Sequence, residues 1–209
     1  MVFNYFRHGD SHVRLAWFGL HTRGFSLIEL ITVTGVIVIL STILLANYNK
    51  FGGAITLRNI VYDVALSMRE AQTYGISVRK FGEGAGSFGA GYGVHFEITS
   101  PTSYLIFGDA VNANGLYEAG ESVQLLTMLG GYQLNDLRVT PTGGGAEITG
   151  LDKLDVLFQR PDPDAYIRAN DLTGTLYQRA CIVIESPRGD VLSVIVELTG
   201  QISVQNTCN

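Results

Sequence analysis

The chain has 209 residues, enough for one large domain or two small ones. Charged residues make up 16% of it, below the roughly 25% usual for soluble domains, and its mean hydropathy is positive. These values exclude a disordered chain, and the net charge of −5 argues against a general nucleic-acid-binding protein, which needs a basic surface. Two cysteines are too few for a disulfide scaffold or a four-ligand zinc site.

A short basic leader precedes a long apolar run. Residues 1–24 contain three arginines and one acid, and their apolar stretch is too short for the core of an ordinary secretory signal. Residues 25–46 contain one ionisable group, Glu29. As a helix they would reach about 33 Å, enough to cross a bilayer core of about 30 Å. This pattern predicts a transmembrane helix with the leader in the cytoplasm and the remainder of the chain translocated.

Glu29 is the feature of this run that needs an explanation. A charge inside a spanning helix is costly, so it is a functional candidate by default. The alternative is a residue near the helix end that reaches the membrane interface, which costs little. Charge alone does not decide between them.

The surrounding residues 23–29, RGFSLIE, together with the apolar run, resemble the prepilin cleavage and methylation motif of type IV pilins and type II secretion pseudopilins. The resemblance implies that a membrane peptidase cuts after Gly24 and methylates the new amino group of Phe25. It also implies that Glu29, the fifth mature residue, neutralises that ammonium between neighbouring subunits. The implied partners are prepilin peptidase, other pilin or pseudopilin subunits, the inner-membrane assembly platform and, before assembly, membrane lipid.

A second helical pattern follows the apolar run. Residues 47–80 are expected to form the amphipathic second half of one long helix, with its clearest periodicity over residues 54–75. Gly52 and Gly53 lie between the halves and are expected to bend or loosen the helix. The apolar stripe that should face a sheet consists of Leu57, Ile60, Val61, Val64, Met68 and Ala71.

Residues 81–209 are rich in glycine and in alternating runs. A G-x-G-x-x-G pattern at residues 84–89 follows a helix and leads into a strand, so we interpret it as a connection and not as a dinucleotide site. The last three runs predict an antiparallel meander. The predicted strands are 91–98, 103–109, 121–128, 132–140, 154–158, 178–186, 191–198 and 201–205.

This order resembles the pilin-like fold, and within it the pseudopilin H group and the related minor pilins; the supporting stretches are 64–78, 92–121 and 199–204. The expected class is α+β, with one long N-terminal helix, membrane-spanning in its first half, packed on an antiparallel sheet domain. The expected divisions are a leader (1–24), a transmembrane segment (25–46), the second half of the helix (47–80) and a β-rich domain (81–209). Segment 141–177 matches nothing familiar.

An oxygen-rich segment is the one candidate metal site. With Gly115 at the sixth position of a calcium loop, four side chains fall at ligand positions, but Ala110 stands where Asp belongs and Asp109 is one residue away. Asn-Gly is also a strong hairpin signal, so a plain surface turn is preferred and calcium is the alternative. The candidate ligands are Asp109, Asn112, Asn114, Glu118 and Glu121.

The two cysteines give opposing indications. Translocation would expose Cys181 and Cys208 to an oxidising compartment, where disulfides persist. A simple meander, however, leaves Cys208 on the order of 16 Å beyond Cys181, whereas a disulfide needs Cα atoms within about 7 Å. Only a tail that folds back would close the bond, and both alternatives stay open.

Two functions from different classes remain. The first is a structural subunit of a pilus or secretion pseudopilus; the second is a tip or minor pilin that binds a ligand such as DNA. Removal of residues 1–24 leaves 11 basic (14 − 3) and 18 acidic (19 − 1) residues, a net charge of −7, which disfavours DNA unless Arg160, Arg168, Arg179 and Arg188 cluster. His95 is expected to be a surface or hydrogen-bonded structural residue, and no catalytic constellation supports an enzyme.

Overall fold

The computed structural model describes residues 24–77, 79–81, 89–170 and 177–208, except for the side chains of residues 46–51. The chain divides into two compact units, Met1–Ala46 and Asn47–Asn209. The leader before residue 24 and most of the G-x-G-x-x-G segment, residues 82–88, lie outside the described residues.

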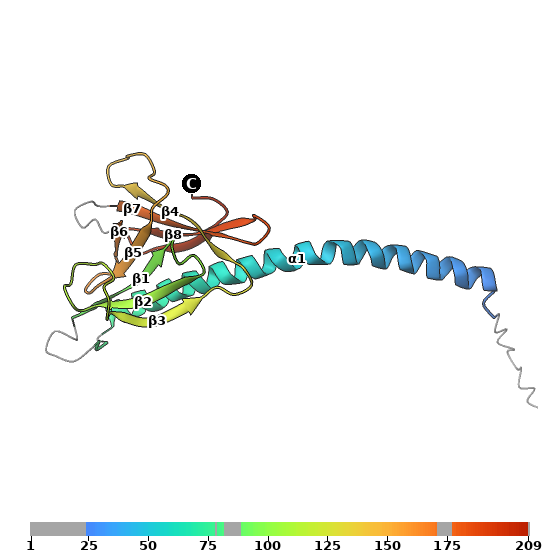
Figure 1. Cartoon of the computed structure of the whole chain (residues 1–209), viewed down its shortest axis with the longest axis horizontal. Helices are drawn as coiled ribbons and strands as arrows, with labels where there is room; N and C mark the ends of the chain where they lie inside the picture. The colour runs from blue at the N-terminus through green and yellow to red at the C-terminus, as the bar shows by residue number, and fades with distance from the viewer. Residues whose placement is uncertain (1–23, 78, 82–88, 171–176, 209) are drawn as a thin grey trace, which may run out of the picture. The chain divides into compact units, whose positions relative to one another are not determined.

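Helix α1 spans Leu27–Ile76 and contributes to both units (Figure 1). It continues through Gly52 and Gly53, where the sequence predicted a bend or a loosened helix. Each glycine costs the helix about 1 kcal/mol relative to alanine. One local contact offsets this cost, because the Tyr132 hydroxyl donates a hydrogen bond of 3.1 Å to the Gly53 carbonyl oxygen.

Antiparallel strands form two sheets in the described part of the chain, with the orders β3-β2-β1-β5-β6 and β4-β7-β8-β9 (Figure 1). The last three strands form the predicted meander. The class is therefore α+β. The strands are β1 (Gly91–Glu97), β2 (Ser103–Asp109), β3 (Ser122–Thr127), β4 (Gln133–Pro141), β5 (Lys153–Phe158), β6 (Ala165–Ala169), β7 (Tyr177–Glu185), β8 (Val191–Glu197) and β9 (Ile202–Gln205).

The sequence pattern did not predict β6. This strand has only five residues, carries Arg168, and follows a segment with two prolines, Pro161 and Pro163. It lies at the edge of its sheet and pairs only with β5. An edge strand needs one partner, so a short and partly polar segment is sufficient.

One hydrophobic core joins the second unit's part of α1 to both sheets. The predicted apolar stripe of the helix is buried there, apart from Ile60, which is half-buried against the core. Facing side chains come from the first sheet, for example Val94 and Phe96, and from the second, for example Ile182 and Val194. This burial is the main stabilising term of the unit.

The tightest contact between helix and sheet is at Gly75. A β-carbon there would overlap the backbone oxygen of Phe158 and lie 2.7 Å from its carbonyl carbon. The backbone of Phe158 is held in β5, which pairs on both sides, so it cannot move away cheaply.

We predict that Gly75→Ala destabilises the protein by about 2–3 kcal/mol because the added methyl group overpacks this contact. Gly52→Ala is the matched control: it also lies in α1, but nothing lies within 4 Å of the added carbon. There alanine should stabilise by about 0.5–1 kcal/mol. Thermal unfolding of both variants in detergent checks the opposite signs, and equal effects would contradict the packing argument.

Candidate functional site

The start of α1 is fixed by Ser26. Its carbonyl oxygen accepts a hydrogen bond of 3.1 Å from the Leu30 amide, and its hydroxyl oxygen accepts one of 3.2 Å from the Glu29 amide. Ser26 is therefore the N-cap residue and Glu29 occupies the third helical position. Ser-x-x-Glu is the sequence signature of a capping box, a signal that the sequence analysis did not use.

Gly24 and Phe25 precede the helix and are exposed. The Phe25 side chain is 74% exposed, and nothing lies within 4 Å of the position that a β-carbon on Gly24 would take. The peptide bond between them thus lies in non-helical, uncovered backbone immediately before a capped helix. Exposed, non-helical backbone of this kind is accessible to a protease.

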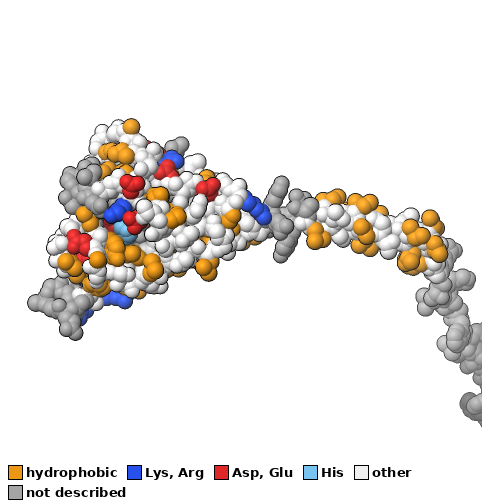
Figure 2. All heavy atoms as spheres, viewed as in Figure 1, with side chains coloured by type: hydrophobic (Ala, Val, Ile, Leu, Met, Phe, Trp, Pro, Cys, Tyr) orange, Lys and Arg blue, Asp and Glu red, His pale blue; other side chains and the backbone are white. Residues whose placement is uncertain are grey.

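The segment that follows has the composition of a membrane span. Leu27–Leu45 has a mean hydropathy of 2.4 and is long and apolar enough to cross a bilayer. Its apolar side chains are exposed along the helix (Figure 2). Threonine hydroxyls within it donate to carbonyl oxygens of the preceding turn, as Thr34 does to Leu30 at 2.8 Å and Thr42 to Val38 at 2.8 Å. These polar groups are therefore satisfied without a partner helix.

Glu29 differs from these threonines. Its carboxylate lies in the first turn of α1, where the helix dipole favours a negative charge. The ion pairs found among the described residues do not include it. Transfer of a lone carboxylate into lipid costs several kcal/mol.

The oxygen-rich segment 109–121 uses its carboxylates within the loop. The two carboxylate oxygens of Glu121 accept hydrogen bonds from the amides of Ala110 (3.0 Å), Val111 (2.9 Å) and Glu118 (2.9 Å). Asp109 accepts one from the Gly115 amide at 2.8 Å. Both acids are buried, so this is more than a plain surface turn. The two acids anchor the loop backbone, as Asp and Glu side chains do in local turns.

The side chains of the remaining candidate calcium ligands form a second group, in which Asn112 is exposed and Asn114 and Glu118 are half-buried. The side-chain amides of Asn112 and Asn114 donate to the carboxylate of Glu118 at 2.7–3.0 Å. Within the described residues, no group of three or more His, Cys, Asp or Glu side chains is arranged to hold a metal ion. The five candidate ligands are therefore divided between two internal hydrogen-bond clusters.

Asp109 carries an electrostatic cost. Burial raises the pKa of its carboxyl, an effect that the hydrogen bond from the Gly115 amide opposes and the neighbouring Glu121 charge reinforces. One carboxylate oxygen, Oδ1, has no hydrogen-bond partner among the described residues. A buried acceptor in this state favours the protonated form.

Cys181 and Cys208 form a disulfide with a Cα–Cα distance of 5.8 Å. The strand register is that of a simple meander, as expected: Cys181 pairs with Ile195 and Ile195 pairs with Ser203, so Cys208 follows five residues after the position aligned with Cys181. The segment after β9 brings Cys208 back within reach of Cys181. Strand β9 ends at Gln205, and the chain bends at residues 206 and 207, which returns Cys208 to β7.

His95 is buried and paired. Its Nδ1 lies 2.7 Å from Oδ1 of Asp155, the residue opposite it on β5, and its ring contacts the Tyr117 ring at a centroid distance of 4.9 Å. Asp155 was not singled out from the sequence, since only the strand register reveals the pairing. The contact with Tyr117 places the His95–Asp155 pair against the 109–121 loop.

Comparison of the chain with family models, with curated proteins and with solved structures gives no match. The geometry at residues 24–29 is therefore the basis of the functional argument.

The disulfide generates a stability prediction. Its cysteines are 27 residues apart, and a loop of that length is expected to contribute about 3–4 kcal/mol by restricting the unfolded chain. Addition of reductant should lower the unfolding temperature of the wild type and leave Cys181→Ala/Cys208→Ala unaffected. If both proteins responded equally, the bond would contribute nothing to stability.

Asp109 generates a pH prediction. The pKa of Asp109 is higher in the folded protein than in the unfolded chain, so its protonated form stabilises the fold. This stabilisation is fully present below the ordinary Asp pKa of about 3.9 and is lost as the pH rises through the raised pKa of the folded protein. Asp109→Asn should therefore gain stability relative to wild type between pH 4 and neutral pH. Asp152→Asn, at an exposed carboxylate, is the control. Denaturant unfolding at several pH values tests this, and parallel curves would contradict it.

Proposed function

We propose that this chain is a structural subunit of a filament of the type IV pilin and type II secretion pseudopilin kind, cut after Gly24 by a prepilin peptidase. The observation that carries the proposal is the arrangement at the start of α1. An exposed Gly24–Phe25 bond is followed directly by the capped start of α1, and Glu29 is the single ionisable side chain of its apolar segment, Leu27–Leu45. A subunit of this kind is held by its span in the cytoplasmic membrane, with the second unit outside the cytoplasm.

Cleavage would create the cation that Glu29 needs. A new α-amino group on Phe25 lies only one helical turn from the Glu29 carboxylate in sequence, but it precedes the helix, whose N-cap residue is Ser26. In a filament, the ammonium of one subunit can approach the Glu29 of its neighbour, so that each charge neutralises the other in apolar surroundings. The pair then couples release from lipid to a defined stagger between subunits.

The fold is compatible with this role. The resemblance to the pilin-like fold implies one long helix packed on an antiparallel sheet domain, and the chain has an α1 of 50 residues and two antiparallel sheets among its described residues. The buried disulfide at the end of the chain suits a domain outside the cytoplasm, where disulfides persist.

DNA binding gains no support as an alternative. Of the four arginines that would need to form a basic patch, Arg179 pairs with Glu197 at 2.8 Å, and the Nε of Arg168 is buried. Phosphate contacts need accessible, uncompensated cations.

Replacement of Glu29 tests the proposal. Glu29→Gln keeps the size of the side chain but removes its charge, so cleavage should continue while entry into filaments fails or falls strongly. Gly24→Val is the companion variant, because a branched side chain beside the scissile bond should block cleavage and leave the precursor in the membrane. Immunoblots of membrane and sheared filament fractions distinguish the two defects. Entry of Glu29→Gln into filaments at the wild-type level would refute the charge pair.

A further inference from the structure

Within the second unit, α1 has an exposed face opposite its buried stripe. Three apolar side chains run along the middle of this face, with exposed fractions of 48% for Ile55, 56% for Tyr62 and 64% for Leu66. Their spacings of seven and four residues place them on one line along the helix. We call the exposed side of the helix the outer face; it consists of Ile55, Arg58, Asn59, Tyr62, Asp63, Leu66, Arg69 and Glu70.

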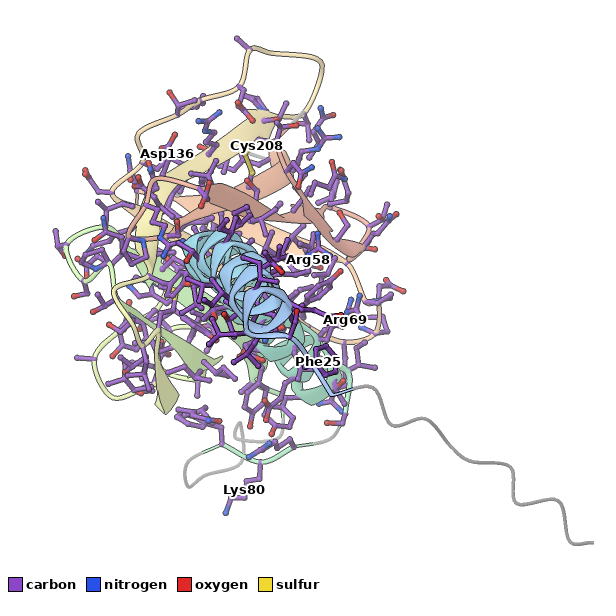
Figure 3. All side chains as sticks on the ribbon, turned by 90° about the vertical axis from the view of Figure 1, so that its right-hand side faces the viewer. Phe25, Arg58, Arg69, Lys80, Asp136 and Cys208 are labelled. Carbon is purple, nitrogen blue, oxygen red and sulfur yellow. A yellow bond between two sulfur atoms is a disulfide. The ribbon has the colours of Figure 1, made fainter. Side chains whose placement is uncertain are left out.

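Charges of opposite sign border the apolar line. At 100° per residue, Arg58 and Arg69 fall on one edge of the outer face, and Asp63 and Glu70 fall on the other. Arg58 and Arg69 lie on the same side of the helix in the structure (Figure 3). Arg58, Asp63 and Arg69 are exposed, and Glu70 is half-exposed. The outer face therefore has a basic edge, an apolar centre and an acidic edge.

A groove lies along each edge. The acidic edge and the edge strand β3 line a groove of about 600 Å³ that includes Leu66, Leu125 and Leu129. A smaller groove of about 270 Å³ lies between the helix and β9, beside Arg69. Leu125 and Leu129 are exposed, so an apolar side chain from a partner would find apolar surface in the larger groove.

This charge pattern selects the orientation of a second copy. When two identical helices pack in parallel across this face, the basic edge of each faces the acidic edge of the other. When they pack antiparallel, basic faces basic and acidic faces acidic, which is repulsive. The pattern is complementary to itself in the parallel arrangement alone.

The spacing agrees with parallel packing. In heptad notation, Asn59 and Leu66 occupy a positions and Ile55 and Tyr62 occupy d positions. Arg69 falls at the next d position, so the apolar seam ends at Leu66. Arg58 then falls at g, and Asp63, five residues later, falls at the following e. In parallel coiled coils these two positions meet across the interface, so Arg58 of each copy faces Asp63 of the other.

We propose that the outer face of α1 binds the same face of a second copy of this chain, in parallel, with Arg58 of each opposite Asp63 of the other. The inference rests on the proposed function in one respect: a single span inserted in one direction makes every copy parallel. Confinement to a membrane also raises the effective concentration, so a seam of fewer than three heptads is sufficient to pair the chains.

Charge reversal in full-length chains tests this. In the proposed symmetric pair, Arg58→Glu places a glutamate opposite Asp63 of the other copy at both contacts. Asp63→Arg places an arginine opposite Arg58 of the other copy at both contacts. Energy transfer between donor- and acceptor-labelled chains in phosphatidylethanolamine–phosphatidylglycerol vesicles, measured against protein density, gives the self-association. Each single variant should associate about tenfold more weakly, which corresponds to about 1.4 kcal/mol over two contacts.

Two combinations should restore association. A chain carrying both changes has the charges exchanged and should pair with itself to within about threefold of wild type. A mixture of the two single variants should associate better than either alone, since every opposing pair then has opposite signs. The controls Lys80→Glu and Asp152→Arg make the same charge changes at exposed positions that are not part of the outer face, and they should have no effect. Figure 3 shows Lys80 well apart from Arg58 and Arg69.

The outcomes separate this inference from the proposed function. Equal association of wild type, single variants and mixtures would overturn the pairing through the outer face, as would an absence of association in the wild type. Processing after Gly24 and dependence on Glu29 would be untouched by that result. Conversely, the chain could pair in a charge-dependent way although no prepilin peptidase cuts it. That result would support the parallel pair and contradict the proposed filament function.

Discussion

The proposed function depends above all on the free energy of a carboxylate in hydrocarbon. Glu29 lies in the first turn of an apolar segment in which the hydroxyl groups of threonines such as Thr34 and Thr42 already bond to the helix backbone. Local hydrogen bonds satisfy such hydroxyls, but they cannot neutralise a charge. In the proposed function, the cation beside Glu29 is the amino terminus of Phe25, which the proposed cleavage frees.

After the apolar segment, α1 packs on the sheets and presents the outer face. Its buried stripe anchors two sheets, so the part of α1 that carries Met68 and Ala71 cannot rotate about its axis without breaking the core. This fixes which side chains point outward. The outer face, with Arg58 and Asp63 on opposite edges, is therefore a preorganised surface, and preorganisation reduces the entropy lost on binding.

Features set by local chemistry could be predicted from the sequence. The helix, its buried stripe and most strands follow from periodicity, because burial repeats every 3.6 or 2 residues. Features set by distant contacts could not. The pairing of His95 with Asp155 depends on the register of β1 and β5, and the return of Cys208 depends on a bend after β9. The short edge strand β6 has too little pattern to stand out.

The loop 109–121 shows a different limit. Its acids are spaced like metal ligands, but the same oxygens can serve as acceptors for backbone amides, and spacing alone does not distinguish the two uses. In the structure Glu121 binds three amides and Asp109 one. The Ser26 cap was predictable, by contrast, because Ser-x-x-Glu before an apolar run has a defined local geometry.

The intact mass of the chain isolated from its native membrane tests the central claim most directly. The account predicts a species that lacks residues 1–24, begins at Phe25 and carries one additional methyl group on its amino terminus. A chain that retains its leader, or one that begins at any other residue, would contradict it.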